Sequence, residues 1–150
     1  MEKVVLPNDI LLNEVDRLLS EGRDVVMMPK GRSMLPFIRG EVDKVLLRKP
    51  SAGALQVGDI VLARLDGSRY ILHRVVAIDG TRVIMMGDGN LRGREEVAEN
   101  EVVGKVVEII TLKGRHRKPT RGWLWRQLLP VRKYLLKIYR KTNKILIHKS

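Results

Sequence analysis

Residues 60–79 read IVLARLDGSRYILHRVVAID and indicate a β-hairpin. Ile60–Leu65 and Ser68–Asp79 are rich in aliphatic and β-branched residues, as strands are. Asp66-Gly67 lies between them, and this dipeptide favours the type I′ turn that joins two antiparallel strands. Because side chains alternate along a strand, His73 is expected on the same face as Ile71 and Val75.

The same pattern extends outward from the hairpin over residues 24–112. Short β-rich runs follow one another between Gly, Pro, Asp and Asn, and a second turn is expected at Asp79-Gly80. With no helical spacers, these runs predict a mainly β fold, as an antiparallel sheet or small barrel. The further expected strands are Val25–Met28, Val42–Leu47, Arg82–Met86 and Val102–Ile110.

Helical patterns lie at both ends of the chain. Residues 8–21 predict an amphipathic helix, capped by Asn8 or Asp9 and ended by Gly22. Residues 123–147 are helical in pattern again, and Pro130 should kink or split that helix. We therefore expect one domain over residues 1–112, with its β-rich core from about residue 24, and a basic amphipathic tail over residues 113–150.

The positive charge of the chain belongs to that tail. Residues 113–150 carry 13 Lys and Arg and no acidic residue, whereas residues 1–112 carry 16 basic and 17 acidic residues. Trp and Leu interleaved with Arg and Lys suit an anionic membrane surface or packing against the domain. They also suit single-stranded nucleic acid, but the first two are favoured, because the domain has no basic excess and no nucleic-acid motif.

The composition of the chain limits the cofactors and the cellular location that we expect. It has no cysteine, and its three histidines lie far apart, so we expect no metal or other cofactor. No signal peptide opens the sequence, and no run of about 18 apolar residues occurs. The expected location is cytoplasmic, peripheral on the inner face of the membrane if the tail binds there.

Four short motifs follow one another in the domain: Gly31–Pro36 (GRSMLP), Val57–Val61 (VGDIV), His73–Val75 (HRV) and Gly87–Asn90 (GDGN). They supply a serine on a tight loop, an imidazole on a strand and a carboxylate in a turn, the residue types of activated acyl transfer. Each also has a structural interpretation. Ser33 can be a turn serine, His73 a buried core histidine, and Asp88 part of an ordinary turn.

Taken together, the motifs resemble those of the signal peptidase I family and the related self-cleaving SOS-type repressor domains, over about residues 25–110. The resemblance implies their shared β-rich fold, with Ser33 as nucleophile and His73 as general base. The His-Arg-Val context is similar to the histidine-type branch. The loop residues Gly31, Arg32, Met34 and Pro36 would then shape the oxyanion and substrate site.

The chain departs from the family pattern at three points. The later aspartate of histidine-type members is missing, since residues 91–96 read LRGREE. Asp88 is our expected third residue, with Glu95 and Glu96 as the other candidates. Gly31 stands where many relatives have a serine that donates to the oxyanion, which leaves backbone N–H groups for that role. An amphipathic helix precedes the serine where true signal peptidases have a membrane anchor.

The function expected from these features is serine endopeptidase activity on a peptide or precursor-protein segment, added as a strand beside the sheet. One alternative is a catalytically inactive member of the same fold that binds a peptide or partner. The other is a protein that binds a membrane surface or nucleic acid through residues 113–150.

Overall fold

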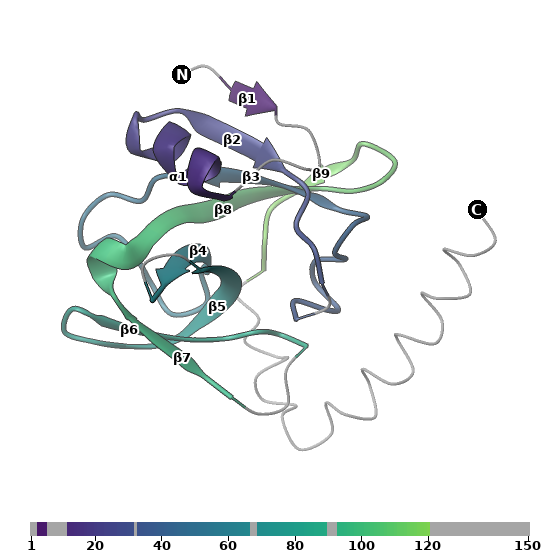
Figure 1. The fold of residues 1–150 in the computed structure, drawn as a ribbon. Helices are drawn as coiled ribbons and strands as arrows, with labels where there is room; N and C mark the ends of the chain where they lie inside the picture. Colours follow the sequence, from purple (N-terminus) through teal and green to yellow (C-terminus); the bar gives the residue numbers. More distant parts are fainter. Residues whose placement is uncertain (1–2, 6–11, 32, 67–68, 90–92, 121–150) are drawn as a thin grey trace.

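The computed structural model describes residues 3–5, 12–31, 33–66, 69–89 and 93–120. In this part of the chain the protein is mainly β, with one short α-helix and a strongly curled sheet that forms a half-barrel (Figure 1). The expected mainly β class is therefore confirmed. The predictions for the helix cap at Asn8 or Asp9, for Arg32, Gly67 and Asn90, and for the tail beyond residue 120 lie outside the described residues.

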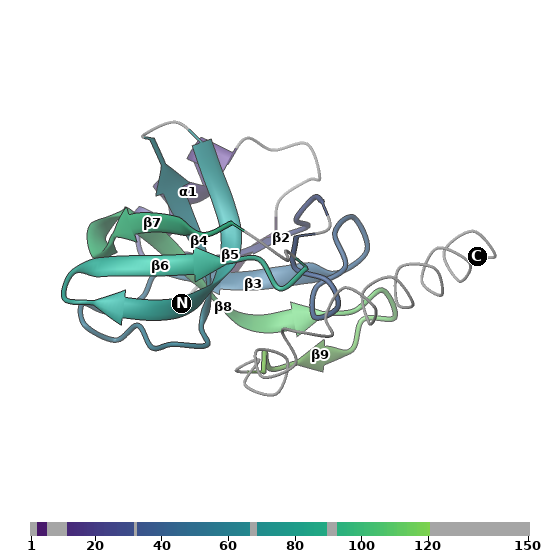
Figure 2. The same cartoon turned by 90° about the horizontal axis from the view of Figure 1, so that it is seen from below.

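Nine strands of the described residues belong to one sheet, seen from below in Figure 2. The spatial order is β1-β2-β3-β8-β4-β5-β6-β7, with β9 paired to β8, and only the β1–β2 pairing is parallel. The strands are β1 (Lys3–Val5), β2 (Asp24–Met27), β3 (Lys44–Arg48), β4 (Ile60–Leu65), β5 (Arg69–Asp79), β6 (Arg82–Met86), β7 (Glu95–Ala98), β8 (Val102–Ile110) and β9 (His116–Arg117), with a 3₁₀ turn at Glu99–Glu101.

The hairpin predicted at residues 60–79 is β4–β5, and its strands pair from Ile60↔Arg74 to Leu65↔Arg69. Asp66 has a φ of 53°, the left-handed region that a type I′ turn requires. The second turn differs from the expectation. Asp79 pairs with Arg82 inside the ladder, so the two turn residues are Gly80 and Thr81 rather than Asp79 and Gly80.

The helix α1 (Leu12–Ser20) covers one face of the sheet near β2 and β8 (Figure 1). Its buried residues Val15, Leu18 and Leu19 recur at helical spacing and join the larger core. The other members of this core include Val45, Leu47, Ile60, Leu62, Val106 and Ile109. Burial of the apolar stripe in this core therefore holds the helix against the sheet.

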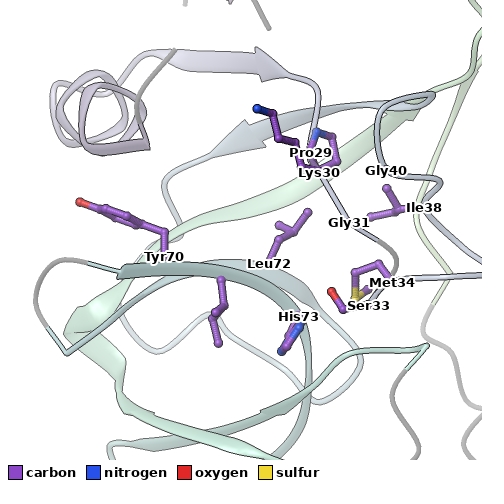
Figure 3. A pocket seen from close by; sticks show the side chains of 11 residues that line it. Pro29, Lys30, Gly31, Ser33, Met34, Ile38, Gly40, Tyr70, Leu72 and His73 are labelled. Carbon is purple, nitrogen blue, oxygen red and sulfur yellow. The ribbon is translucent and has the colours of Figure 1, made fainter. Parts of the chain in front are cut away.

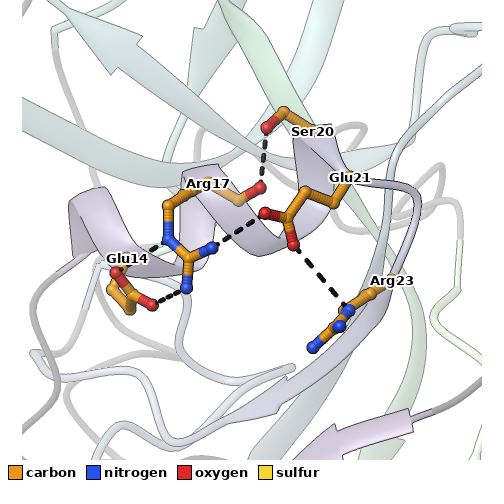
Figure 4. Close-up of polar contacts among 5 residues, drawn as sticks. All are labelled: Glu14, Arg17, Ser20, Glu21 and Arg23. Atoms are coloured by element: carbon orange, nitrogen blue, oxygen red, sulfur yellow. Dashed lines mark hydrogen bonds and ion pairs between the residues drawn. The ribbon is translucent and has the colours of Figure 1, made fainter.

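The opposite face of α1 is polar, and Figure 4 shows its exposed contacts. Arg17 bonds Glu14 and, at 2.8 Å, Glu21, which are the neighbours that helical spacing places beside it. The hydrogen bond from Arg17 lowers the pKa of Glu14. Such solvent-exposed pairs contribute little to stability.

A half-buried cluster also ties α1 to the β4–β5 hairpin. The Asp16 carboxylate accepts hydrogen bonds from Arg64 Nη2 and from the Tyr70 hydroxyl, each at 2.7 Å. Burial, followed by the hydrogen bond to Asp16, raises the pKa of Tyr70, so its hydroxyl remains a donor. This cluster holds the start of β5 under the helix.

The two faces of the hairpin pack into different cores. Ile60 and Leu62 belong to the core under α1, whereas Val61, Ala63 and Val75 belong to a second core with Val83, Met85 and Val97. His73 pairs with Val61 and therefore shares the face of the second core. Arg74, the next residue, lies on the opposite face.

The sheet continues past the expected domain boundary at residue 112. Ile109 and Ile110 pair with Arg117 and His116, so β9 is part of the same sheet. Among the described residues, no helix combines the length and apolar character that crossing a bilayer demands.

Candidate active site

Ser33 and His73, the two residues expected to carry the chemistry, line the same pocket, which has a volume of about 180 Å³ (Figure 3). Ser33 and Met34 lie at one end of the pocket and Tyr70 at the other. The remaining lining residues are Pro29, Lys30, Gly31, Ile38, Gly40, Ile71 and Leu72. The fold thus brings together a hydroxyl and an imidazole from distant segments.

The pocket is a slot between two lengths of backbone. Tyr70, Ile71, Leu72 and His73 all line it, although their side chains alternate between the two faces of β5. The pocket must therefore run along the edge of the strand. β6 pairs with β5 only from Arg74 onward, so in the described part of the chain this edge has no partner strand. Pro29–Gly31, just beyond β2, form the other wall.

The loop that carries Ser33 is held by close backbone contacts. Phe37 and Ile38 donate their N–H groups to the Met34 carbonyl, both at 3.0 Å. The Gly89 N–H donates to the Ser33 carbonyl at 2.6 Å, which joins the fourth motif directly to the first. Pro36 follows a cis peptide bond, and Met34 is buried.

Gly31 and Gly40 allow two parts of this loop to touch. Gly31 has a φ of 89°, where glycine is favoured. A Cβ atom on Gly40 would stand 1.9 Å from the Gly31 carbonyl oxygen, inside contact distance. The Glu41 N–H also donates to the Pro29 carbonyl at 2.8 Å. Only a residue without a side chain fits at position 40.

We therefore expect Gly40→Ala to destabilise the protein by about 3 kcal/mol, the upper end of typical overpacking costs, because the clash is with backbone and cannot be relieved by rotating a side chain. The measurement is the free energy of unfolding in urea. Gly53→Ala is the matched control, since a Cβ there meets nothing within 4 Å at a φ of 74°. It should cost only roughly 1–2 kcal/mol of left-handed strain. Equal losses in the two variants would contradict this account of the loop.

The His73 ring is held by Glu95, through a short contact between Nδ1 and Oε1. Strand register explains the pairing. Glu95 of β7 stands opposite Met85 of β6, and Met85 stands opposite Val75 of β5, two residues from His73. All four side chains therefore share one sheet face. A carboxylate on Nδ1 favours the tautomer with the proton there, which leaves Nε2 free to accept one.

Asp88, our expected partner for His73, lies elsewhere. Its two carboxylate oxygens accept hydrogen bonds from Nε and Nη2 of Arg74, each at 2.7 Å. Because Arg74 lies on the sheet face opposite His73, the prediction that Asp88 orients the imidazole is wrong in its geometry. Glu95, one of the two other candidates, makes that contact. Glu96 alternates to the other face and pairs with Arg82.

Arg74 is the residue that sequence analysis missed. It is fully buried, and besides Asp88 it donates to the Gly58 carbonyl at 2.8 Å and to the Thr120 carbonyl. The Phe37 ring lies 5.1 Å from its Cζ atom. Arg74 therefore contacts the second and fourth motifs and the end of the Ser33 loop. An arginine in the buried middle of a strand needs a buried anion, and that signal was present in the sequence.

The second motif, Val57–Val61, holds β5 in place through backbone hydrogen bonds. Gly58 and Asp59 exchange backbone hydrogen bonds with Val75, at 2.8 and 2.7 Å. The Asp59 carboxylate accepts the Gln56 N–H at 2.8 Å. This aspartate is thus a structural residue of the strand entry, and the motif positions the segment that carries His73.

The described residues form no hydrogen bond between the Ser33 hydroxyl and the His73 ring. Contacts between a nucleophile and its base are often long without substrate and shorten when substrate binds. Within the same residues the Ser33 N–H makes no hydrogen bond either. An amide left in this state beside the hydroxyl suits an oxyanion.

We compared the chain with known proteins. No family model matches it, and a search of the curated proteins finds no match.

Proposed function

We propose that the protein is a serine endopeptidase of the signal-peptidase-like group, with Ser33 as nucleophile, His73 as general base and Glu95 as the residue that orients the base. The observation that carries the proposal is the pocket shared by Ser33 and His73, with the Glu95 carboxylate on Nδ1 of the ring. A serine hydroxyl, an imidazole and a carboxylate are the parts that acyl transfer needs.

In the proposed reaction, Ser33 Oγ attacks the scissile carbonyl while Nε2 of His73 takes its proton. Glu95 stabilises the imidazolium that results. The tetrahedral intermediate then breaks its C–N bond, and His73 returns the proton to the departing amine. Water, deprotonated by His73, attacks the Ser33 ester, and the acid product leaves as the hydroxyl is restored.

The oxyanion of the intermediate is proposed to lie against backbone N–H groups of the Ser33 loop. The Ser33 amide is the first candidate donor, since it is free of hydrogen bonds among the described residues. Gly31 gives the loop its left-handed turn and contributes no side chain to the pocket wall. Backbone donors held by such close packing need little reorganisation when negative charge develops on the carbonyl oxygen.

The proposed substrate is an extended peptide segment that adds to the sheet as a strand. Its backbone would bond to residues 69–73 along the edge of β5 opposite β4, which has no partner strand among the described residues, with Pro29–Gly31 on the other side. The distance from Tyr70 to His73 along a strand is roughly 10 Å, so the slot holds about three extended residues. We also propose that the half-barrel has the fold shared by signal peptidases and SOS-type repressors.

Replacing Glu95 with glutamine tests the proposed role of the carboxylate. The amide keeps the size of the side chain but neither favours the required tautomer nor stabilises the imidazolium, so we expect the cleavage rate to fall on the order of 10²- to 10⁴-fold. The substrate is a library of unfolded, proteome-derived peptides, with new termini counted by mass spectrometry.

Glu96→Gln is the matched control, because its carboxylate is half-exposed and faces away from His73. Its rate should stay within about twofold of the wild type, as for other surface substitutions. Equal rates for the two variants would remove Glu95 from the mechanism. Peptides that bind without being cut would favour the peptide-binding alternative.

A further inference from the structure

A short segment after the long strand β8 makes hydrogen bonds to residues next to the candidate active site. We call residues 116–120 the strap. They begin in β9, which pairs with the end of β8, and lie near the start of the basic tail at residues 113–150. Arg117 and Pro119 in the strap are half-buried. The strap is thus part of the folded domain and not only the start of the tail.

The strap makes one hydrogen bond beside the Ser33 loop and another beside His73. The Arg117 guanidinium donates through Nη2 to the Phe37 carbonyl, at the end of the turn that begins at Met34 beside Ser33. The Thr120 carbonyl accepts from Nη1 of Arg74, the residue after His73. Phe37 and Arg74 are themselves in contact, ring over guanidinium.

These contacts close a ring of interactions from the Ser33 loop through Phe37 and Arg117 to the strap, and through Thr120 and Arg74 back to His73. Charge-assisted hydrogen bonds to backbone carbonyls are among the stronger and more directional contacts in proteins. We propose that the strap sets the position of the Ser33 loop relative to His73, which makes Arg117 a positioning residue for acyl transfer. This inference rests on the proposed function.

The test uses the full chain and a neutral alkyl fluorophosphonate. In the labelling step the Ser33 Oγ–P bond forms, the P–F bond breaks with release of fluoride, and His73 takes the hydroxyl proton. The saturation curve gives a limiting rate and a half-saturating concentration. For Arg117→Gln we expect the limiting rate to fall about tenfold with an unchanged half-saturating concentration, since the loop is displaced but the pocket remains.

Arg115→Gln is the matched control, because Arg115 is exposed in the same hairpin and its side chain makes no hydrogen bond or ion pair with a described residue. It should label at the wild-type rate. An Arg117→Gln limiting rate equal to that of Arg115→Gln overturns the inference. If Arg117→Gln does not fold, Arg117→Lys takes its place, because lysine keeps the charge but not the planar fork. A threefold or greater loss of its limiting rate supports the inference, and a smaller loss overturns it.

The two proposals are tested separately. Labelling of the wild type that is lost in Ser33→Ala concerns the proposed function. The ratio of the limiting labelling rates of Arg117→Gln and Arg115→Gln, compared at equal thermal stability, tests the role of the strap.

Discussion

Ser33→Ala should lower peptide cleavage by at least about 10³-fold, because the proposed reaction begins with a covalent bond to this hydroxyl. The measurement is the initial rate on the peptide library, with the variant and the wild type at the same concentration. Ser51→Ala is the control, since Ser51 is an exposed serine in the loop before β4 and does not line the pocket. Its rate should equal that of the wild type.

His73→Ala should produce a loss of similar size, and the double variant should be no slower than either single one, because the two residues act as a unit. Cleavage that survives both single substitutions would contradict the proposed pair.

Asp88→Ala should destabilise the fold by about 3–5 kcal/mol, because it leaves the buried guanidinium of Arg74 without its counter-charge. The side chains of this ion pair are only 1% and 3% exposed. The free energy of unfolding in urea measures the effect. We expect lower cleavage as well, since Arg74 adjoins His73 and its other contacts reach the Ser33 loop.

Glu96→Ala provides the comparison for this ion pair. The Arg82–Glu96 pair joins two strands of the same sheet, but its side chains are 51% and 54% exposed, so its loss should cost at most about 1 kcal/mol. The variant Asp88→Leu with Arg74→Met should recover part of the loss, because both buried charges are then gone. Equal destabilisation by Asp88→Ala and Glu96→Ala would show that the buried pair is not a main support of the site.

The local sequence pattern was sufficient to predict much of the sheet. Ile60–Leu65, Arg82–Met86 and Val102–Ile110 begin and end where alternation and turn residues predicted. The strands that escaped prediction are short or polar. β7 contains two adjacent glutamates, and β9 has two residues in a basic segment. Their strand conformation comes from pairing with β6 and β8, and local propensity does not favour it.

The choice among Asp88, Glu95 and Glu96 shows where prediction from sequence ends. Alternation predicts that Glu95 and Glu96 face opposite ways, but not which of them faces His73. That depends on the register of β5, β6 and β7 together, including the shift between Val75 and Ala77 in β5. Asp88 does not reach His73, because the buried guanidinium of Arg74 binds both oxygens of its carboxylate.

The sequence by itself determined the mainly β class, the β4–β5 hairpin and the two candidate residues Ser33 and His73, because side-chain alternation and turn chemistry act over a few neighbouring residues. Only the tertiary structure decided that these two share a pocket, that Glu95 holds the imidazole and that Arg74 takes Asp88. Each of these depends on strand register and on which buried charges meet, and both are set by pairing between segments distant in the chain.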